Sequence, residues 1–95
     1  MRVVAPPDVG TLVRERGGTL YVWPDAKACC GGALTLLFTA AAPEPGRRFT
    51  RVEAEGFELW FDPGVLDPPD ELHLGVRGRG TKRVEAYWNG CLYAV

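Results

Sequence analysis

Two stretches of this chain, 57–62 and 71–77, alternate between apolar and mainly polar residues, which is the pattern of a β-strand with one buried face. The apolar positions are Phe57, Leu59 and Phe61 in the first stretch and Leu72, Leu74 and Val76 in the second. The opposite positions are Glu58 and Trp60 in the first and His73, Gly75 and Arg77 in the second. Because such a strand must bury its apolar face against another layer, this pattern predicts a layered β structure.

Further strands are predicted around these two. Residues 49–54 and 57–62 flank Glu55-Gly56 and predict a hairpin. Residues 19–23 are strong β formers, and we expect this strand to end at Pro24-Asp25. Residues 33–39 are apolar without alternation, which favours a central strand, with a buried helix as the alternative. A last strand carries Val84, Ala86 and Trp88 on one face.

One short helix precedes the strands. Asp8, after Pro6-Pro7, is the predicted N-cap, and Arg14 lies in the predicted last turn. Gly17-Gly18 supplies a left-handed stop. The predicted fold class is therefore mainly β, an α+β chain with one short amino-terminal helix and about six strands in two packed layers.

Size and composition narrow the class of protein. Ninety-five residues, 46% of them hydrophobic, predict a single domain over 1–95. The longest apolar run, 33–42, is interrupted by threonines and is too short to cross a membrane. Pro6, Pro7 and Asp8 interrupt any signal-peptide core, so we expect a cytoplasmic protein. A net charge of −1 argues against a nucleic-acid partner.

The three cysteines are the residues with the most distinctive chemistry. Cys29 and Cys30 are adjacent, and their Cα atoms, about 3.8 Å apart, are too close for an unstrained disulfide. Gly31-Gly32 permits a bend that presents both thiols to solvent. Cys91 follows Asn89-Gly90, a dipeptide suited to a tight turn. Glycine-flanked cysteines in a cytosolic chain favour metal binding or redox chemistry over structural disulfides.

Other interpretations stay open at this stage. A Cys30–Cys91 disulfide is one alternative, and three inert thiols that fill space are another. His73, the only histidine, is expected to be an ordinary strand residue. Three tryptophans, Trp23, Trp60 and Trp88, are expected to pack. A basic hairpin tip, formed by Arg77, Arg79, Lys82 and Arg83, is expected to be a solvated turn, with contact to a nucleic acid or an acidic partner as the alternative.

The order of these features resembles the HesB-like domain of A-type iron-sulfur carrier proteins. The resemblance covers residues 17–93 and rests on residues 56–63 (Gly-Phe-Glu-Leu-Trp-Phe-Asp-Pro) and on Asn89-Gly90-Cys91. Within that family, the chain is most similar to a small bacterial branch with a Cys-Cys or Cys-selenocysteine motif. Here Tyr21-Val22-Trp23-Pro24 leads to Cys29-Cys30-Gly31-Gly32.

The resemblance implies a two-layer, β-sandwich-like domain that assembles into dimers or larger oligomers. It also implies that Cys29, Cys30 and Cys91 bind an iron-sulfur cluster or iron, with iron-sulfur donor or acceptor proteins as partners. The family carries a Cys-Gly-Cys near the carboxyl end. This chain has one thiol there, in Gly90-Cys91-Leu92-Tyr93, and its additional thiol lies beside the first.

Three functions follow from these residues. The first is a cysteine-dependent binding protein for an iron-sulfur cluster or another thiophilic metal, with Cys29, Cys30 and Cys91 as ligands. The second is a thiol redox protein that uses the vicinal cysteines. The third is a non-enzymatic interaction module that has lost cluster binding. A single histidine and the absence of a Ser-His-Asp set or a paired-carboxylate site argue against hydrolysis, so we expect a binding protein before an enzyme.

Overall fold

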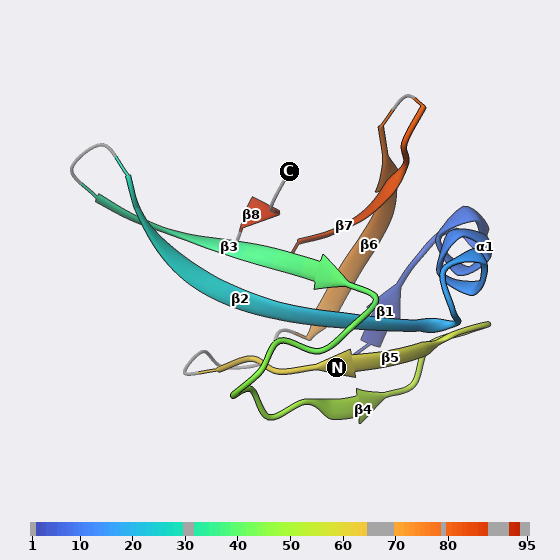
Figure 1. The fold of residues 1–95 in the computed structure, drawn as a ribbon, viewed down its shortest axis with the longest axis horizontal. Coiled ribbons are helices and arrows are strands. Elements are labelled where there is room, and N and C mark those ends of the chain that lie inside the picture. Colours follow the sequence, from blue (N-terminus) through green and yellow to red (C-terminus); the bar gives the residue numbers. More distant parts are fainter. Residues whose placement is uncertain (1, 30–31, 65–69, 79, 88–91, 94–95) are drawn as a thin grey trace.

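The computed structural model describes residues 2–29, 32–64, 70–78, 80–87 and 92–93, and for 26–29, 32–36 and 92–93 it describes the backbone alone. Within these residues, one helix and eight strands form two sheets (Figure 1). The three-stranded sheet has the order β1 (Arg2–Val4), β6 (Glu71–Arg77) and β7 (Arg83–Tyr87). The five-stranded sheet has the order β4 (Thr50–Val52), β5 (Glu58–Phe61), β2 (Thr19–Cys29), β3 (Gly32–Ala40) and β8 (Leu92–Tyr93). The prediction of a mainly β fold with one short amino-terminal helix is confirmed.

The helix, α1 (Pro7–Glu15), begins differently from the prediction. Asp8 is not the N-cap: Pro6 holds that position with an extended backbone, and Pro7 is the first helical residue. Proline suits this place because its fixed φ matches the helix and its missing N–H needs no partner. Gly17-Gly18, with φ of 112° and 87°, ends the helix as predicted. Among the described residues, no helix has the length and apolar character that crossing a membrane requires.

The strand β2 is much longer than the sequence predicted. The prediction of a turn at Pro24-Asp25 is wrong, because β2 continues through both residues to Cys29. Pairing with β5 stops at Val22, so Pro24 lies where β2 has a described partner strand on one side, β3. Proline is tolerated at such an edge, since no ladder hydrogen bond requires its missing N–H.

The two alternating stretches form strands as predicted. In the β4–β5 hairpin, Thr50 lies opposite Phe61, and in the β6–β7 hairpin Gly75 lies opposite Glu85. The apolar positions of β5 and β6 face the interior: Leu59 and Leu72 are fully buried. Residues 33–39 lie within β3, an internal strand between β2 and β8, so the alternative of a buried helix is wrong.

Two short strands were not predicted. β1 pairs with β6 in parallel, with Val3 opposite Leu72, and the Arg2 backbone N–H donates to the Asp70 carbonyl at 2.8 Å. β8 pairs with β3 in parallel, with Leu92 opposite Leu36. Stretches of two or three residues are too short to show a periodicity.

The hydrophobic core lies between the two sheets, with one face of α1 packed against it. In Figure 1 the β6–β7 hairpin crosses the direction of β2 and β3. The core residues come from the helix and from both sheets: Val9, Leu12, Val13, Leu20, Val22, Leu37, Leu59, Phe61, Leu72, Leu74, Val84 and Ala86. A hydrogen bond also joins the sheets, because the Thr39 hydroxyl on β3 donates to the Val84 carbonyl on β7 at 2.6 Å. The two layers therefore enclose one continuous core.

Candidate functional site

The structure describes one of the three predicted cysteine ligands. Cys29 is the last residue of β2, and its Cα pairs with that of Gly32, the first residue of β3. Cys30 and Cys91 lie outside the described residues, as do Trp88 and Asn89-Gly90. Cys29 therefore ends a long strand, whereas the predicted strand ends at Pro24-Asp25, before the cysteines.

The hairpin that carries Cys29 extends away from the helix. β2 and β3 pair continuously, from Tyr21 opposite Ala40 to Cys29 opposite Gly32. In Figure 1 the carboxyl end of β2 and the amino end of β3 lie on the side of the molecule opposite α1. Pairing to β5 supports β2 up to Val22 and not beyond. The cysteine end of the hairpin is thus held away from the main core.

β8, the strand that follows Cys91 in the sequence, lies against the same hairpin. Leu92 pairs with Leu36, four residues along β3 from Gly32, which corresponds to about 13 Å at ~3.3 Å per residue. Because β8 and β3 are parallel, the amino end of β8 is directed toward the Gly32 end of β3. The topology therefore places Cys29 and Leu92 beside the same strand, with partners on β3 that are four residues apart.

An aromatic cluster covers the base of the hairpin. Trp23 on β2 stacks on Phe38, its partner across the ladder, with ring centroids 6.0 Å apart. Phe49 meets two rings of β2 edge-on, those of Tyr21 at 5.1 Å and Trp23 at 5.9 Å. Trp23 is 8% exposed although it is not part of the core between the sheets. The predicted packing role of this tryptophan is confirmed, and the cluster stiffens the base of the cysteine hairpin.

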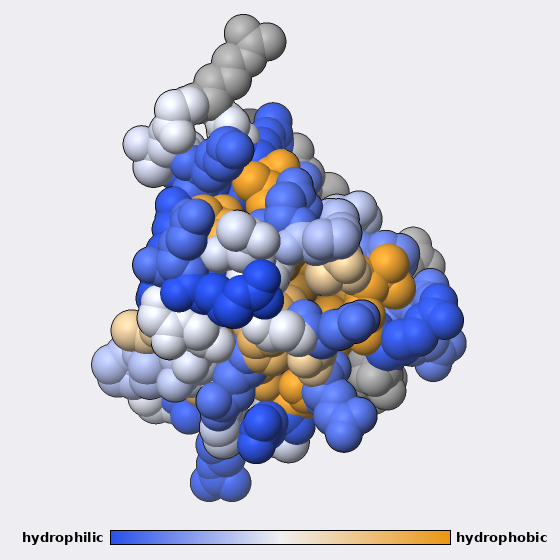
Figure 2. Space-filling view, turned by 90° about the vertical axis from the view of Figure 1, so that its right-hand side faces the viewer, coloured by the Kyte–Doolittle hydropathy of each residue, from blue (hydrophilic) through white to orange (hydrophobic). Residues whose placement is uncertain are grey.

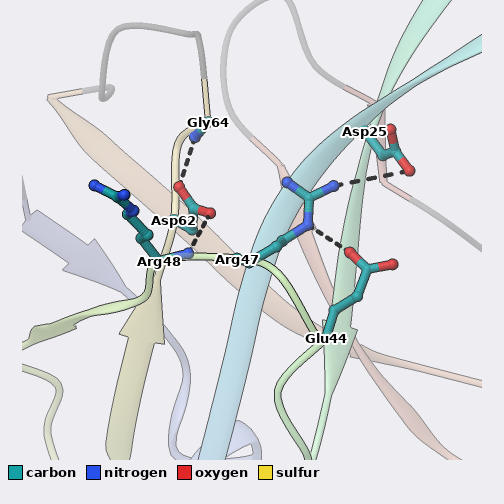
Figure 3. A network of polar contacts seen from close by, with 6 residues as sticks. All are labelled: Asp25, Glu44, Arg47, Arg48, Asp62 and Gly64. Carbon is teal, nitrogen blue, oxygen red and sulfur yellow. Dashed lines mark hydrogen bonds and ion pairs between the residues drawn. The ribbon is translucent and has the colours of Figure 1, made fainter.

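A network of charged groups adds to this support, and the sequence analysis did not find it (Figure 3). Arg47, on the loop between β3 and β4, pairs with Glu44 on the same loop and lies 3.8 Å from the Asp25 carboxylate on β2. Its guanidinium also lies over the Trp23 ring, 5.9 Å from the centroid. Asp25 belongs to the outer part of β2, past the last pairing to β5. Arg47 therefore ties the loop to the hairpin between its base and its cysteine end.

A second carboxylate fixes the other side of that loop. Asp62 accepts hydrogen bonds from two backbone N–H groups, those of Arg48 at 3.1 Å and Gly64 at 2.8 Å (Figure 3). Because Asp62 follows β5 directly, these bonds attach the loop to the end of that strand. The signal in the sequence is the Asp62-Pro63-Gly64 turn, whose aspartate accepts from the N–H two residues later.

The described side chains show no alternative metal site. No group of three or more His, Cys, Asp or Glu among them is placed to hold a metal ion. His73, on β6, has its Nε2 3.6 Å from the Glu71 carboxylate and stacks its ring on Tyr87 at a centroid distance of 5.4 Å. His73 thus makes the neighbour contacts of an ordinary strand residue, as predicted. The candidate site remains the three cysteines and the strands that lead to them.

The chain is similar in fold to a protein of known structure. No protein-family model matches the sequence, and no curated protein matches it significantly. Among solved structures, the chain is similar to Escherichia coli SufA, a protein involved in biosynthesis of iron-sulfur clusters. The two share 16% sequence identity at a TM-score of 0.53, and the match covers 90% of this chain and 79% of SufA. This likeness supports a HesB-like fold for the chain.

Proposed function

We propose that this chain is a cytoplasmic binding protein for an iron-sulfur cluster or iron, with Cys29, Cys30 and Cys91 as the ligands. The observation that carries the proposal is the register of β3. That strand pairs with Cys29 at its first residue, Gly32, and with Leu92, the residue after Cys91, at Leu36. Two residues that are far apart in the sequence thereby pair with one strand, four positions apart.

The chemistry of the donor set fits this cargo. Cysteine thiolates are the ligands that hold iron-sulfur clusters, and soft sulfur ligands also select other thiophilic metals. The chain offers three thiols, one fewer than the four ligands of a common cluster site. We propose that a second copy of the chain, or a small thiol, supplies the remaining sulfur. An open or shared position also suits a protein that receives a cluster from one partner and delivers it to another.

The fold gives independent support. The chain shares its architecture with SufA, which is involved in biosynthesis of iron-sulfur clusters. The braced hairpin base, with Trp23 stacked on Phe38 and Arg47 bound to Asp25, suits a site that must keep its ligands at a fixed place.

The direct test is anaerobic reconstitution with ferrous iron and sulfide, followed by visible absorption and by analysis of bound iron and sulfide. We expect a coloured protein, and we expect Cys29→Ser, Cys30→Ser and Cys91→Ser each to reduce the iron and sulfide retained. Thr50→Ser, on the exposed edge strand β4, is the matched control and should leave loading unchanged. Native mass spectrometry of the loaded protein would identify a shared site by the number of chains per cluster.

A second measurement separates this function from its competitors. A colourless wild-type protein with no bound metal would contradict the proposal. If the same protein reacted with a disulfide reagent much faster than a free thiol does, the vicinal cysteines would be assigned to thiol redox chemistry instead.

A further inference from the structure

A pocket of about 390 Å³ opens where the two sheets meet the carboxyl end of α1. Its walls come from four places: the end of α1, the start of β2, the end of β3, and the turn from β6 into β7. The residues that matter for its chemistry are Val13, Arg16, Leu20, Lys82, Arg83 and Val84. This volume lies in the range of small-molecule sites, which is roughly 300–1,000 Å³.

At its carboxyl end, β3 has one described partner strand, β2, and its other side leaves room for the pocket. β8 pairs with Leu36 and Leu37, whereas residues 38–40 continue beyond it. There the strand lies near β7, and the Thr39 hydroxyl bridges to the Val84 carbonyl at 2.6 Å. Thr39 and Val84 both line the pocket. The hydrogen bond between them thus holds the two sheets together at this opening.

The charge around the pocket has one sign. Of the residues that the structure describes, Arg16, Lys82 and Arg83 line it, and no aspartate or glutamate does. Among the described residues, these three cations form no ion pair, whereas Arg2, Arg47 and other arginines pair with carboxylates. The whole chain has a net charge of −1, so the pocket is a local concentration of positive charge.

One of these cations is held in place. The Arg16 guanidinium donates to the backbone carbonyl of Lys82, which links the end of α1 to the start of β7. Lys82 and Arg83 are exposed at the rim, where their charges reach solvent. The interior is apolar, because the side chains of Val13, Leu20 and Val84 are 3%, 5% and 5% exposed. Figure 2, which views the molecule from the α1 side, shows hydrophobic surface set among hydrophilic side chains.

We infer that this pocket binds a small amphiphilic anion, a molecule with an apolar body and a carboxylate or phosphate group. The apolar body occupies the space against Val13, Leu20 and Val84. The anionic group lies at the rim and accepts hydrogen bonds from Arg16 and from Lys82 or Arg83. The pocket lies at the base of the β2–β3 hairpin, at the opposite end of these strands from Cys29, and the inference does not depend on the function proposed for the cysteines.

The test is titration of the whole protein by isothermal calorimetry and by NMR chemical shifts, with octanoate and phenyl phosphate as probes. At low salt we expect at least one of them to bind saturably with a Kd of about 1 mM or tighter. Acetate and inorganic phosphate test the anionic group alone, and octanamide tests the apolar body alone. All three should bind more weakly than the favoured probe, which carries both an apolar body and an anionic group. Stronger binding of octanoate identifies a carboxylate site, and stronger binding of phenyl phosphate identifies a phosphate site.

The variants locate the binding. Lys82→Ala combined with Arg83→Ala should weaken the favoured probe about tenfold, since each exposed charge contributes a severalfold effect at most. Arg51→Ala, an exposed cation on β4, is the matched control and should bind like the wild type. Because the replaced side chains are exposed, both proteins should melt at the wild-type temperature. Binding of neither probe, or equal affinity in the double variant and the wild type, would overturn the inference.

Discussion

The indole of Trp23 is stacked on the ring of Phe38, its cross-strand partner, with an angle of 16° between the two planes. The pair lies on the face of the β2–β3 hairpin turned away from the three-stranded sheet, because Val22, the neighbour of Trp23, belongs to the core. The protein thus has a second apolar cluster, outside the core, at the base of the hairpin that carries Cys29.

Replacing Trp23 should therefore cost as much as replacing a core residue. We expect Trp23→Ala to lower the free energy of unfolding by about 3 kcal/mol, because it removes a nearly buried ring and its contacts with Phe38 and Phe49. Urea unfolding followed by circular dichroism measures the loss. Trp60→Ala, at a half-buried position on β5, is the comparison and should cost less. Equal losses for the two tryptophans would show that the second cluster does not stabilise the fold.

The hydrogen bond between the sheets predicts a difference between two small substitutions. Thr39→Val keeps the shape of the side chain but leaves the Val84 carbonyl without the Thr39 donor. We expect it to lower the free energy of unfolding by about 1–2 kcal/mol. Thr39→Ser, which retains the hydroxyl, should lose clearly less. If both variants lose the same amount in chemical denaturation, the hydroxyl bond is not what joins the sheets.

Two glycines with positive φ should respond differently to alanine. At Gly46, with φ of 84°, a new Cβ meets no atom within 4 Å, so Gly46→Ala should cost about 1 kcal/mol, the penalty for the backbone conformation. At Gly78, with φ of 117°, the Cβ would lie 2.5 Å from the Thr81 carbonyl oxygen. Gly78→Ala should therefore cost about 1–3 kcal/mol more than Gly46→Ala, because the turn must also shift. Thermal melting of the two variants checks the order, and a lower melting temperature for Gly46→Ala would contradict it.

The Arg47 network predicts a salt-dependent effect. Arg47→Ala removes the contacts to Asp25 and Glu44 and the cation over Trp23, and should lower the free energy of unfolding by about 1 kcal/mol at low ionic strength. The difference from the wild type should shrink in 0.5 M salt, because the Debye length then falls below about 5 Å. Arg48→Ala, whose contact in this network is made by its backbone N–H, is the control. A loss that does not change with salt would assign the role of Arg47 to packing of its aliphatic stem.

The sequence predicted the strands whose two faces differ. The residues of β5 and β6 alternate between apolar and polar because one face of each strand meets the core and the other meets solvent. Leu59 and Glu58 are one such pair of neighbours. The Gly17-Gly18 stop was also predictable, since non-glycine residues rarely adopt a positive φ.

Other features depend on tertiary context. The local sequence at Pro24 predicts the end of a strand. Pro24 is accommodated within β2 because β5 stops pairing at Val22, and the local sequence does not show where that pairing stops. Asp8 is a good cap by composition, but two prolines before it have backbone angles already suited to starting a helix. β1 forms because its three residues pair with the edge of β6, so their own sequence does not predict a strand.

The candidate sites divide in the same way. Cysteine chemistry is visible in the sequence because the residue types themselves carry it, whereas the pairing of β8 with β3 is a property of the fold. The anion pocket was not foreseen. Arg16 follows the helix, and Lys82 and Arg83 belong to the predicted basic hairpin tip. Nothing in the local sequence indicates that these three residues line one cavity.

The change in support along β2 has a kinetic consequence. At Tyr21 and Val22 the strand is paired on both sides, with β3 and with β5, so amide hydrogen exchange there requires the whole core to open. From Ala26 to Cys29, beyond Trp23 and Asp25, it pairs with β3 and has no further described partner strand, so this outer part can separate while the core stays folded. A single strand thus spans two cooperative units, and the end that carries Cys29 can open by local fraying without global unfolding.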